Sequence, residues 1–72
     1  MTRREEEIMV LTGATLLGRL WGEVTAADLG RMLSFTTRRA RDLLISLQAQ
    51  GEVVRGYHTW RGYTWWRTKP SE

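Results

Sequence analysis

Apolar residues recur at helical spacing in the middle of the chain, between Thr37 and Gln50. On a helical wheel, the apolar side of this segment consists of Ala40, Leu43, Leu44 and Leu47. The opposite side carries Arg38, Arg41, Asp42 and Ile45. Thr36 can cap the start of such a helix, and Gly51 suits the position after its end. The pattern predicts a helix over about residues 37–50 that buries one face and exposes the other.

A longer helix is predicted near the N-terminus, over about residues 4–20. The carboxylates of residues 5–7 suit the positive end of a helix dipole. The apolar face of this helix is expected to consist of Val10, Leu17 and Trp21. Gly13 and Gly18 each weaken a helix interior by about 0.5–1 kcal/mol relative to alanine. These glycines therefore indicate either close packing against a neighbour or an early end of the helix.

A short helix is expected between these two, over about residues 26–33. Thr25 can cap its start, and Asp28, three residues later, can reach back to complete a capping box. Its apolar face is expected to consist of Ala26, Leu29, Met32 and Leu33. In the connection before this helix, Val24 is a candidate for a short strand.

After Gly51 the pattern changes from helical to alternating. Residues 52–55 and 63–67 are rich in β-branched and aromatic side chains and predict two strands of a hairpin that ends near residue 68. Residues 56–62 are bounded by glycines and predict the hairpin loop, with His58 as an exposed loop residue. Alternation puts Trp65 and Trp66 on opposite faces, so one of the two is expected in the core. The tail, residues 69–72, is expected to fray.

The length of 72 residues supports one domain that covers residues 1–72, and the predicted helices and hairpin place it in the α+β class. With 42% hydrophobic and 26% charged residues, the chain is typical of globular proteins. It contains no cysteine, which excludes a disulfide framework and a thiolate metal site. The longest uncharged stretch, residues 8–18, is shorter than a membrane span, and the acidic residues before it differ from the basic start of a secretory signal. A cytoplasmic location is therefore expected.

Positive charge is concentrated in the second half of the chain. Residues 1–30 contain three arginines and five carboxylates, a net charge of −2, whereas residues 31–72 contain eight cations and three carboxylates, a net charge of +5. Ten of the eleven cations are arginines, whose guanidinium group suits bidentate contacts to phosphate or guanine. The asymmetry predicts an anionic partner. The alternative is that the arginines only solvate a small domain.

The predicted element order resembles the winged-helix superfamily of transcription regulators over nearly the whole chain. The positions that carry this resemblance are Thr25, Leu29, Leu33, Thr36, Ala40, Leu44, Leu47, Gly51 and Val53. Residues 40–55, followed by residues 61–66, are also similar to the small PapI/FaeA-type regulators of fimbrial operons. The resemblance implies a winged helix-turn-helix fold of three helices and a two-stranded wing. It also implies action at promoter DNA beside a larger partner regulator.

The helix over residues 37–50 is predicted to read double-stranded DNA, because the major groove admits one helix and displays a distinct pattern for each base pair. Arg38, in the first turn, is the expected base-edge contact, and Thr37 can reach a phosphate or a base. Arg41 and Asp42 follow one turn later. Asp42 either orients an arginine or accepts a hydrogen bond from cytosine. A solvated face held by local ion pairs is the alternative for both arginines.

Two residues of the same helix keep more than one interpretation. Arg39 lies beside the apolar face and is either a phosphate clamp or a structural residue. Ile45, on the outward face, has three open roles, which are contact with thymine methyl groups, a dimer contact and packing under the wing.

The hairpin is predicted to be a second nucleic-acid surface, since its arginines alternate with aromatic residues. Arg55, Trp60 and Arg61 are the candidates, and the last two lie near the loop tip, where they can reach the minor groove or the backbone. His58 is the single histidine and the carboxylates are scattered, so no catalytic triad or metal cage is expected. We expect neither an enzyme nor a cofactor.

Other functions remain open on the sequence alone. A protein-interaction adaptor or inhibitor, for example one carried by a phage or plasmid, would use exposed Ile45, Tyr57 and Trp60 as anchors. A single-stranded nucleic-acid binder would stack bases on the wing aromatics. Because one recognition helix reads few base pairs, a homodimer with its contact on the first helix is a further hypothesis.

Overall fold

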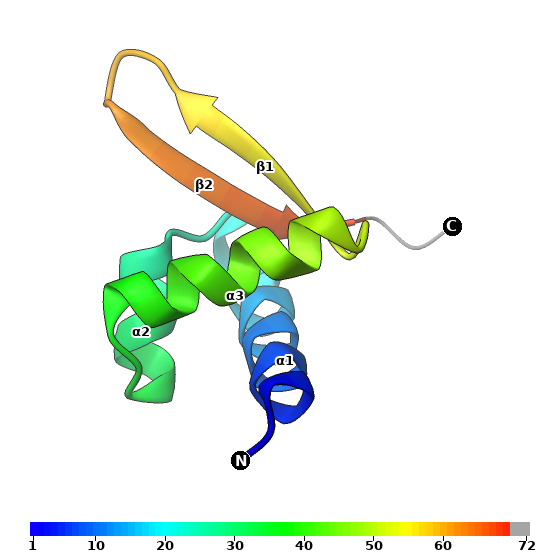
Figure 1. Ribbon diagram of the computed structural model, residues 1–72. Coiled ribbons are helices and arrows are strands. Elements are labelled where there is room, and N and C mark those ends of the chain that lie inside the picture. Colours follow the sequence, from blue (N-terminus) through cyan, green and yellow to red (C-terminus); the bar gives the residue numbers. More distant parts are fainter. Residues whose placement is uncertain (70–72) are drawn as a thin grey trace.

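The computed structural model describes residues 1–69 and contains three helices followed by a two-stranded antiparallel sheet (Figure 1). The elements are α1 (Arg3–Trp21), α2 (Ala26–Leu33), α3 (Thr37–Ala49), β1 (Val53–His58) and β2 (Tyr63–Thr68). The α+β class is confirmed, and the element order is compatible with a winged-helix layout. The expectation for the tail concerns mainly residues 70–72, which lie outside the described residues.

Local signals set both ends of α3. The Thr36 hydroxyl accepts a hydrogen bond of 3.1 Å from the Arg39 backbone N–H and so caps the start of the helix. At the other end, Gly51 has a φ of 79°, and the Glu52 N–H donates to the Leu47 carbonyl at 3.0 Å. This is the hydrogen-bond pattern of a Schellman motif. Both predicted boundaries are confirmed within one residue.

The start of α2 confirms one half of the predicted capping box. The Thr25 hydroxyl accepts from the Asp28 N–H at 3.2 Å. The Asp28 carboxylate, however, accepts from Arg31 at 2.5 Å, one turn further along α2, and does not reach back to the cap. The prediction for Met32 was wrong, because this side chain lies at the edge of the α2 face that packs on the core and is exposed.

A glycine allows the tight turn from α2 to α3. A Cβ atom at Gly30 would lie 2.9 Å from the Phe35 carbonyl oxygen, so the chain folds back directly onto the backbone of α2. The Phe35 N–H donates to the Gly30 carbonyl at 2.8 Å, and Ser34, between them, adopts a left-handed conformation with a φ of 58°. This turn sets the angle at which α3 leaves α2.

The core joins all three helices to the hairpin. Its buried apolar side chains are Val10, Ala14, Val24, Ala26, Leu29, Ala40, Leu43, Leu44, Leu47, Val53 and Trp66. The four apolar residues predicted on α3 are all among them. Gly13 confirms the close-packing interpretation, since a Cβ atom there would lie 3.0 Å from Leu29 Cδ2. Gly18 has no such neighbour.

The predicted core face of α1 was wrong at one position. Trp21 is 67% exposed, although it shares the wheel position of Val10 and Leu17. It lies in the last turn of a helix of 19 residues, which is longer than either helix that packs against it. A favourable wheel position buries a side chain only where a neighbouring element covers that turn.

The hairpin is longer than predicted. Residues 56–58 belong to β1, so the loop shortens to residues 59–62. Gly56 continues the strand because it faces Trp65 across the sheet, and a Cβ atom there would lie 2.0 Å from the indole ring. His58 ends β1, where its ring packs 5.1 Å from the rings of both Trp60 and Tyr63. It is therefore partly covered and not an exposed loop residue.

Val24 holds the hairpin to the helices. It exchanges two backbone hydrogen bonds of 2.8 Å with Trp66, which confirms the short strand as an isolated bridge beside β2. Trp66 is 2% exposed and is the tryptophan of the adjacent pair that enters the core. Beyond this anchor the hairpin extends away from the helices (Figure 1).

Candidate nucleic-acid interface

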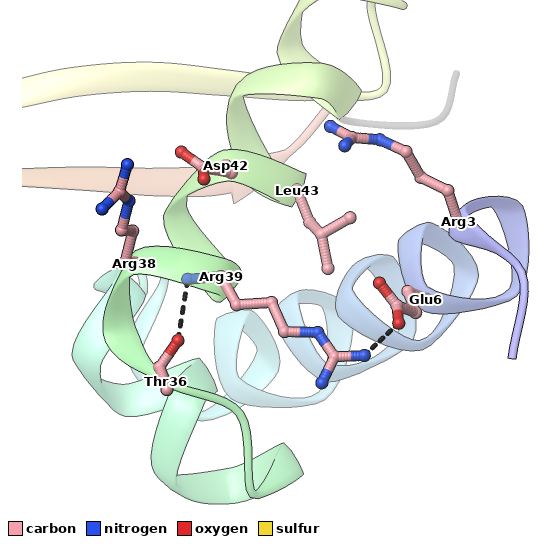
Figure 2. A pocket seen from close by; sticks show the side chains of 7 residues that line it. All are labelled: Arg3, Glu6, Thr36, Arg38, Arg39, Asp42 and Leu43. Carbon is pink, nitrogen blue, oxygen red and sulfur yellow. Dashed lines mark hydrogen bonds and ion pairs between the residues drawn. The ribbon is translucent and has the colours of Figure 1, made fainter.

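The outward face of α3 carries the side chains that the sequence assigned to it. Arg38, Arg41, Asp42 and Ile45 are all exposed. In Figure 2, Arg38 and Asp42 extend from α3 away from α1. Within residues 1–69, neither Arg38 nor Arg41 forms an ion pair, and Asp42 does not orient an arginine through one. The two guanidinium groups therefore face solvent with their hydrogen-bond donors available.

Arg39 points the other way, toward α1 (Figure 2). Its guanidinium group forms an ion pair with the Glu6 carboxylate and lies 4.0 Å from the centre of the Phe35 ring. The structure thus favours the structural alternative for Arg39. Because successive residues of a helix point in different directions, Arg38 faces solvent, whereas Arg39 connects α3 to α1.

A shallow pocket of about 230 Å³ lies between the first half of α3 and the start of α1 (Figure 2). It is lined by Arg3, Glu6, Thr36, Arg38, Arg39, Asp42 and Leu43. Thr37 is exposed at the first position of α3 beside this pocket. The positive end of the α3 dipole and Arg38 favour an anion at the start of α3, whereas the carboxylates of Glu6 and Asp42 in the same lining oppose it.

The wing arginines each lie over an indole ring. The Arg61 guanidinium carbon lies 5.0 Å from the ring centre of Trp60, which is 78% exposed at the tip. Arg55 lies 5.9 Å from Trp66, and Arg67 lies 5.8 Å from Trp65. Such cation–π contacts hold the arginines in place without neutralising them.

The strand register divides these arginines between different sides of the hairpin. Arg55 faces Trp66 across the sheet, so it shares the hairpin face that enters the core at its base. Trp65 and Arg67 alternate with Trp66, and Trp65 lies on the opposite face with Gly56. Of the predicted wing residues, Arg55 therefore lies on the Trp66 face of the hairpin, whereas Trp60 and Arg61 lie in the loop at its tip. Ile45 is 41% exposed on the outward face of α3.

A buried carboxylate that the sequence analysis did not identify fixes the far end of α3. Glu7 of α1 accepts hydrogen bonds from Gln50 Nε2 at 2.5 Å and from Ser46 Oγ at 3.1 Å. Arg3 and Arg4 lie 3.5 and 3.7 Å from its oxygens. With Arg39 and Glu6 near the start of α3, these contacts anchor the helix at two places along its length.

A sequence signal for Glu7 did exist. Glu7 lies three residues before Val10 and seven before Ala14, so the carboxylate shares the buried stripe of α1. A carboxylate at such a position needs hydrogen-bond donors from a neighbouring element. Spacing alone could not identify the donors.

The contacts of the Glu7 carboxylate shift its pKa. The hydrogen bond from Gln50 is the largest influence and lowers the pKa of Glu7; burial opposes it, while Ser46, Arg3 and Arg4 lower the pKa further. The net effect places the pKa below its ordinary value of 4.5. The ionised form of Glu7 therefore stabilises the folded protein above pH 4.5, and this contribution is lost as the pH falls through the lowered pKa.

Replacement of Glu7 by glutamine is expected to lower the melting temperature at neutral pH, because the neutral amide weakens the hydrogen bond from Gln50 and loses the attraction of Arg3 and Arg4. The difference from the parent protein should shrink as the pH falls below the ordinary pKa of 4.5. Thermal unfolding at a series of pH values measures this. The control is Glu52→Gln, which alters an exposed carboxylate and should leave the melting temperature at neutral pH unchanged. A difference for Glu7→Gln that grows at low pH would contradict the assignment.

Comparisons of the chain with models of protein families, with curated proteins and with solved structures gave no match. Among residues 1–69, no three histidine, aspartate or glutamate side chains are grouped so as to hold a metal ion. None of the helices in this part of the chain has both the length and the apolar character to cross a bilayer.

Proposed function

We propose that this protein is a winged helix-turn-helix regulator that binds double-stranded DNA and acts on transcription without catalysis. The observation that carries the proposal is the division of α3 into two faces. Four apolar side chains are buried on one face, while Arg38 and Arg41 are exposed on the other, outside any ion pair among the described residues. This combination suits a helix that enters the major groove from a rigid support.

Each residue of α3 has a role in this proposal. Arg38 contacts a base edge, Thr37 and Arg41 contact phosphates or bases, and Asp42 accepts from cytosine. Ile45 meets thymine methyl groups. The anchoring of α3 by Arg39 and by Glu7 supports the proposal, because a base-reading helix needs a fixed orientation.

The wing adds contacts to DNA that do not depend on the base sequence. Trp60 and Arg61 form its exposed tip and are proposed to meet the minor groove or the sugar-phosphate backbone. Arg55, on the hairpin face that carries Trp66, contacts a phosphate. As the resemblance to the small PapI/FaeA-type regulators implies, a larger regulator would bind beside this protein at the promoter.

The salt dependence of binding tests the proposal. If the protein neutralises about four to six phosphates, log affinity for duplex DNA falls with log salt at a slope of about −4 to −5. Fluorescence anisotropy with a labelled duplex measures the slope. The variant Arg41→Ala should reduce its magnitude by about 1, whereas Arg31→Ala on α2, where the arginine is paired with Asp28, should leave it unchanged. Absence of duplex binding at low salt would overturn the proposal.

A second candidate function is protein binding. Exposed Ile45, Tyr57 and Trp60 favour it, because apolar and aromatic side chains at the surface are frequent anchors of interfaces. A complex with another protein that is insensitive to salt, together with no duplex binding, would favour this adaptor or inhibitor role. Preference for single strands in a competition against duplex would favour base stacking on the wing aromatics.

A further inference from the structure

The outer face of α1 carries exposed apolar side chains, although the inner face of the helix already packs in the core. Ile8 is 50% exposed and Leu16 is 48% exposed, and Thr12 lies between them. At 100° per residue, these side chains point away from Val10 and Ala14, the buried residues of the same helix. Ile8, Thr12 and Leu16 are all exposed in the described part of the chain.

Charged and apolar residues are placed symmetrically along α1 on either side of Thr12. Ile8 and Leu16 lie four residues before and after Thr12. Glu5 and Arg19 lie seven residues before and after it. A spacing of seven residues rotates the position by only about 20° on a helix, so Glu5, Thr12 and Arg19 form one nearly straight row. Within residues 1–69, neither Glu5 nor Arg19 forms an ion pair.

We propose that a second copy of this chain binds to the outer face of α1, with the two α1 helices antiparallel and the two-fold axis at Thr12. In this arrangement Ile8 packs against the partner's Leu16, and Glu5 faces the partner's Arg19. Two-fold symmetry makes both contacts occur twice. A parallel pair would instead bring equal charges together at both ends, so the charge pattern selects the antiparallel dimer.

Thr12 suits the centre of this contact. Its hydroxyl donates to the Ile8 carbonyl of its own helix at 2.9 Å. The hydroxyl therefore keeps its hydrogen bond when a partner covers it, and no polar group is left unsatisfied. The small side chain also lets the two helix backbones approach closely at the axis.

Ile8→Glu is expected to weaken the dimer at least about 100-fold, because each dimer contains the substitution twice and each copy loses an apolar contact. Sedimentation equilibrium over a range of protein concentrations measures the dissociation constant. Circular dichroism checks that the fold is retained, as expected for a change at an exposed position. A parent protein that is monomeric at all concentrations would overturn the proposal, as would a dimer unaffected by Ile8→Glu.

Charge reversal tests the register. Glu5→Arg and Arg19→Glu should each weaken the dimer about 10-fold by placing equal charges opposite one another. The double variant, Glu5→Arg with Arg19→Glu, should restore the affinity of the parent protein. If either substitution destabilises α1 itself, that loss of stability remains in the double variant. Recovery of the dimer affinity can therefore come only from the contact between the two copies. Failure of the double variant to recover would exclude this register.

A cysteine at the axis gives an independent test, since the chain has no cysteine of its own. Thr12→Cys should form a disulfide between copies under mild oxidation, because the axis brings the two positions within disulfide distance. Gln48→Cys, exposed on α3, is the control and should remain unlinked. Equal cross-linking of both variants would contradict a contact at Thr12.

Discussion

Replacement of Trp66 by alanine should come close to unfolding the protein. Truncation of a buried tryptophan costs about 3–5 kcal/mol, and a domain of this length has a total stability of about 4–11 kcal/mol. Trp66 is 2% exposed and is the largest side chain among those fully buried. The backbone bridge to Val24 does not need the indole, but the truncation removes the side-chain packing that joins β2 to the helices.

Thermal or urea unfolding followed by circular dichroism measures this effect. The melting temperature of Trp66→Ala should fall by about 12 °C or more. Trp60→Ala is the matched control, because the same side chain at the wing tip is 78% exposed and its removal should change stability by no more than about 0.5 kcal/mol. Equal losses in the two variants would show that Trp66 does not hold the hairpin in the core.

Arg38→Ala should weaken binding to the preferred DNA sequence by about 5- to 150-fold, which corresponds to about 1–3 kcal/mol for one base-edge contact. It should also relax sequence preference, because the exposed guanidinium group is proposed to read a base. Arg61→Ala should instead weaken binding to all sequences by a similar factor, since its proposed partner is the sugar-phosphate backbone.

Selection from a random pool of duplexes identifies the preferred sequence, and anisotropy titrations then compare it with an unrelated duplex for each variant. Arg31→Ala serves as the control, because this arginine lies on α2 in an ion pair with Asp28. If Arg38→Ala and Arg61→Ala lose affinity equally on both duplexes, the division into base reading and backbone contact is wrong.

The helices could be predicted from sequence because their ends depend on local chemistry. Thr36 and Gly51 act on groups within a few residues, so capping and a positive φ were foreseeable from residue type. The exposure of Arg38 followed from the wheel in the same way. The predicted start of the hairpin loop was wrong for a different reason. Gly56 was interpreted as a strand end, but it makes room for Trp65, which lies on the other strand.

The anchoring of α3 could not be predicted because its partners are distant in sequence. Glu6 lies 33 residues from Arg39, and Glu7 lies 39 and 43 residues from Ser46 and Gln50. Periodicity shows which face of a helix is buried, and it carries no information on which helix covers that face. For the same reason Trp21 was wrongly placed in the core.

The sequence by itself determined the order of elements, the ends of the helices and the two faces of α3, since capping and periodicity act over a few residues. Only the tertiary structure decided between the two roles that the sequence left open for Arg39, a phosphate clamp and a structural residue. Arg38 is exposed, while Arg39 reaches a carboxylate on α1. Such a choice depends on how separate elements pack, because an ion pair forms only where folding brings both groups together.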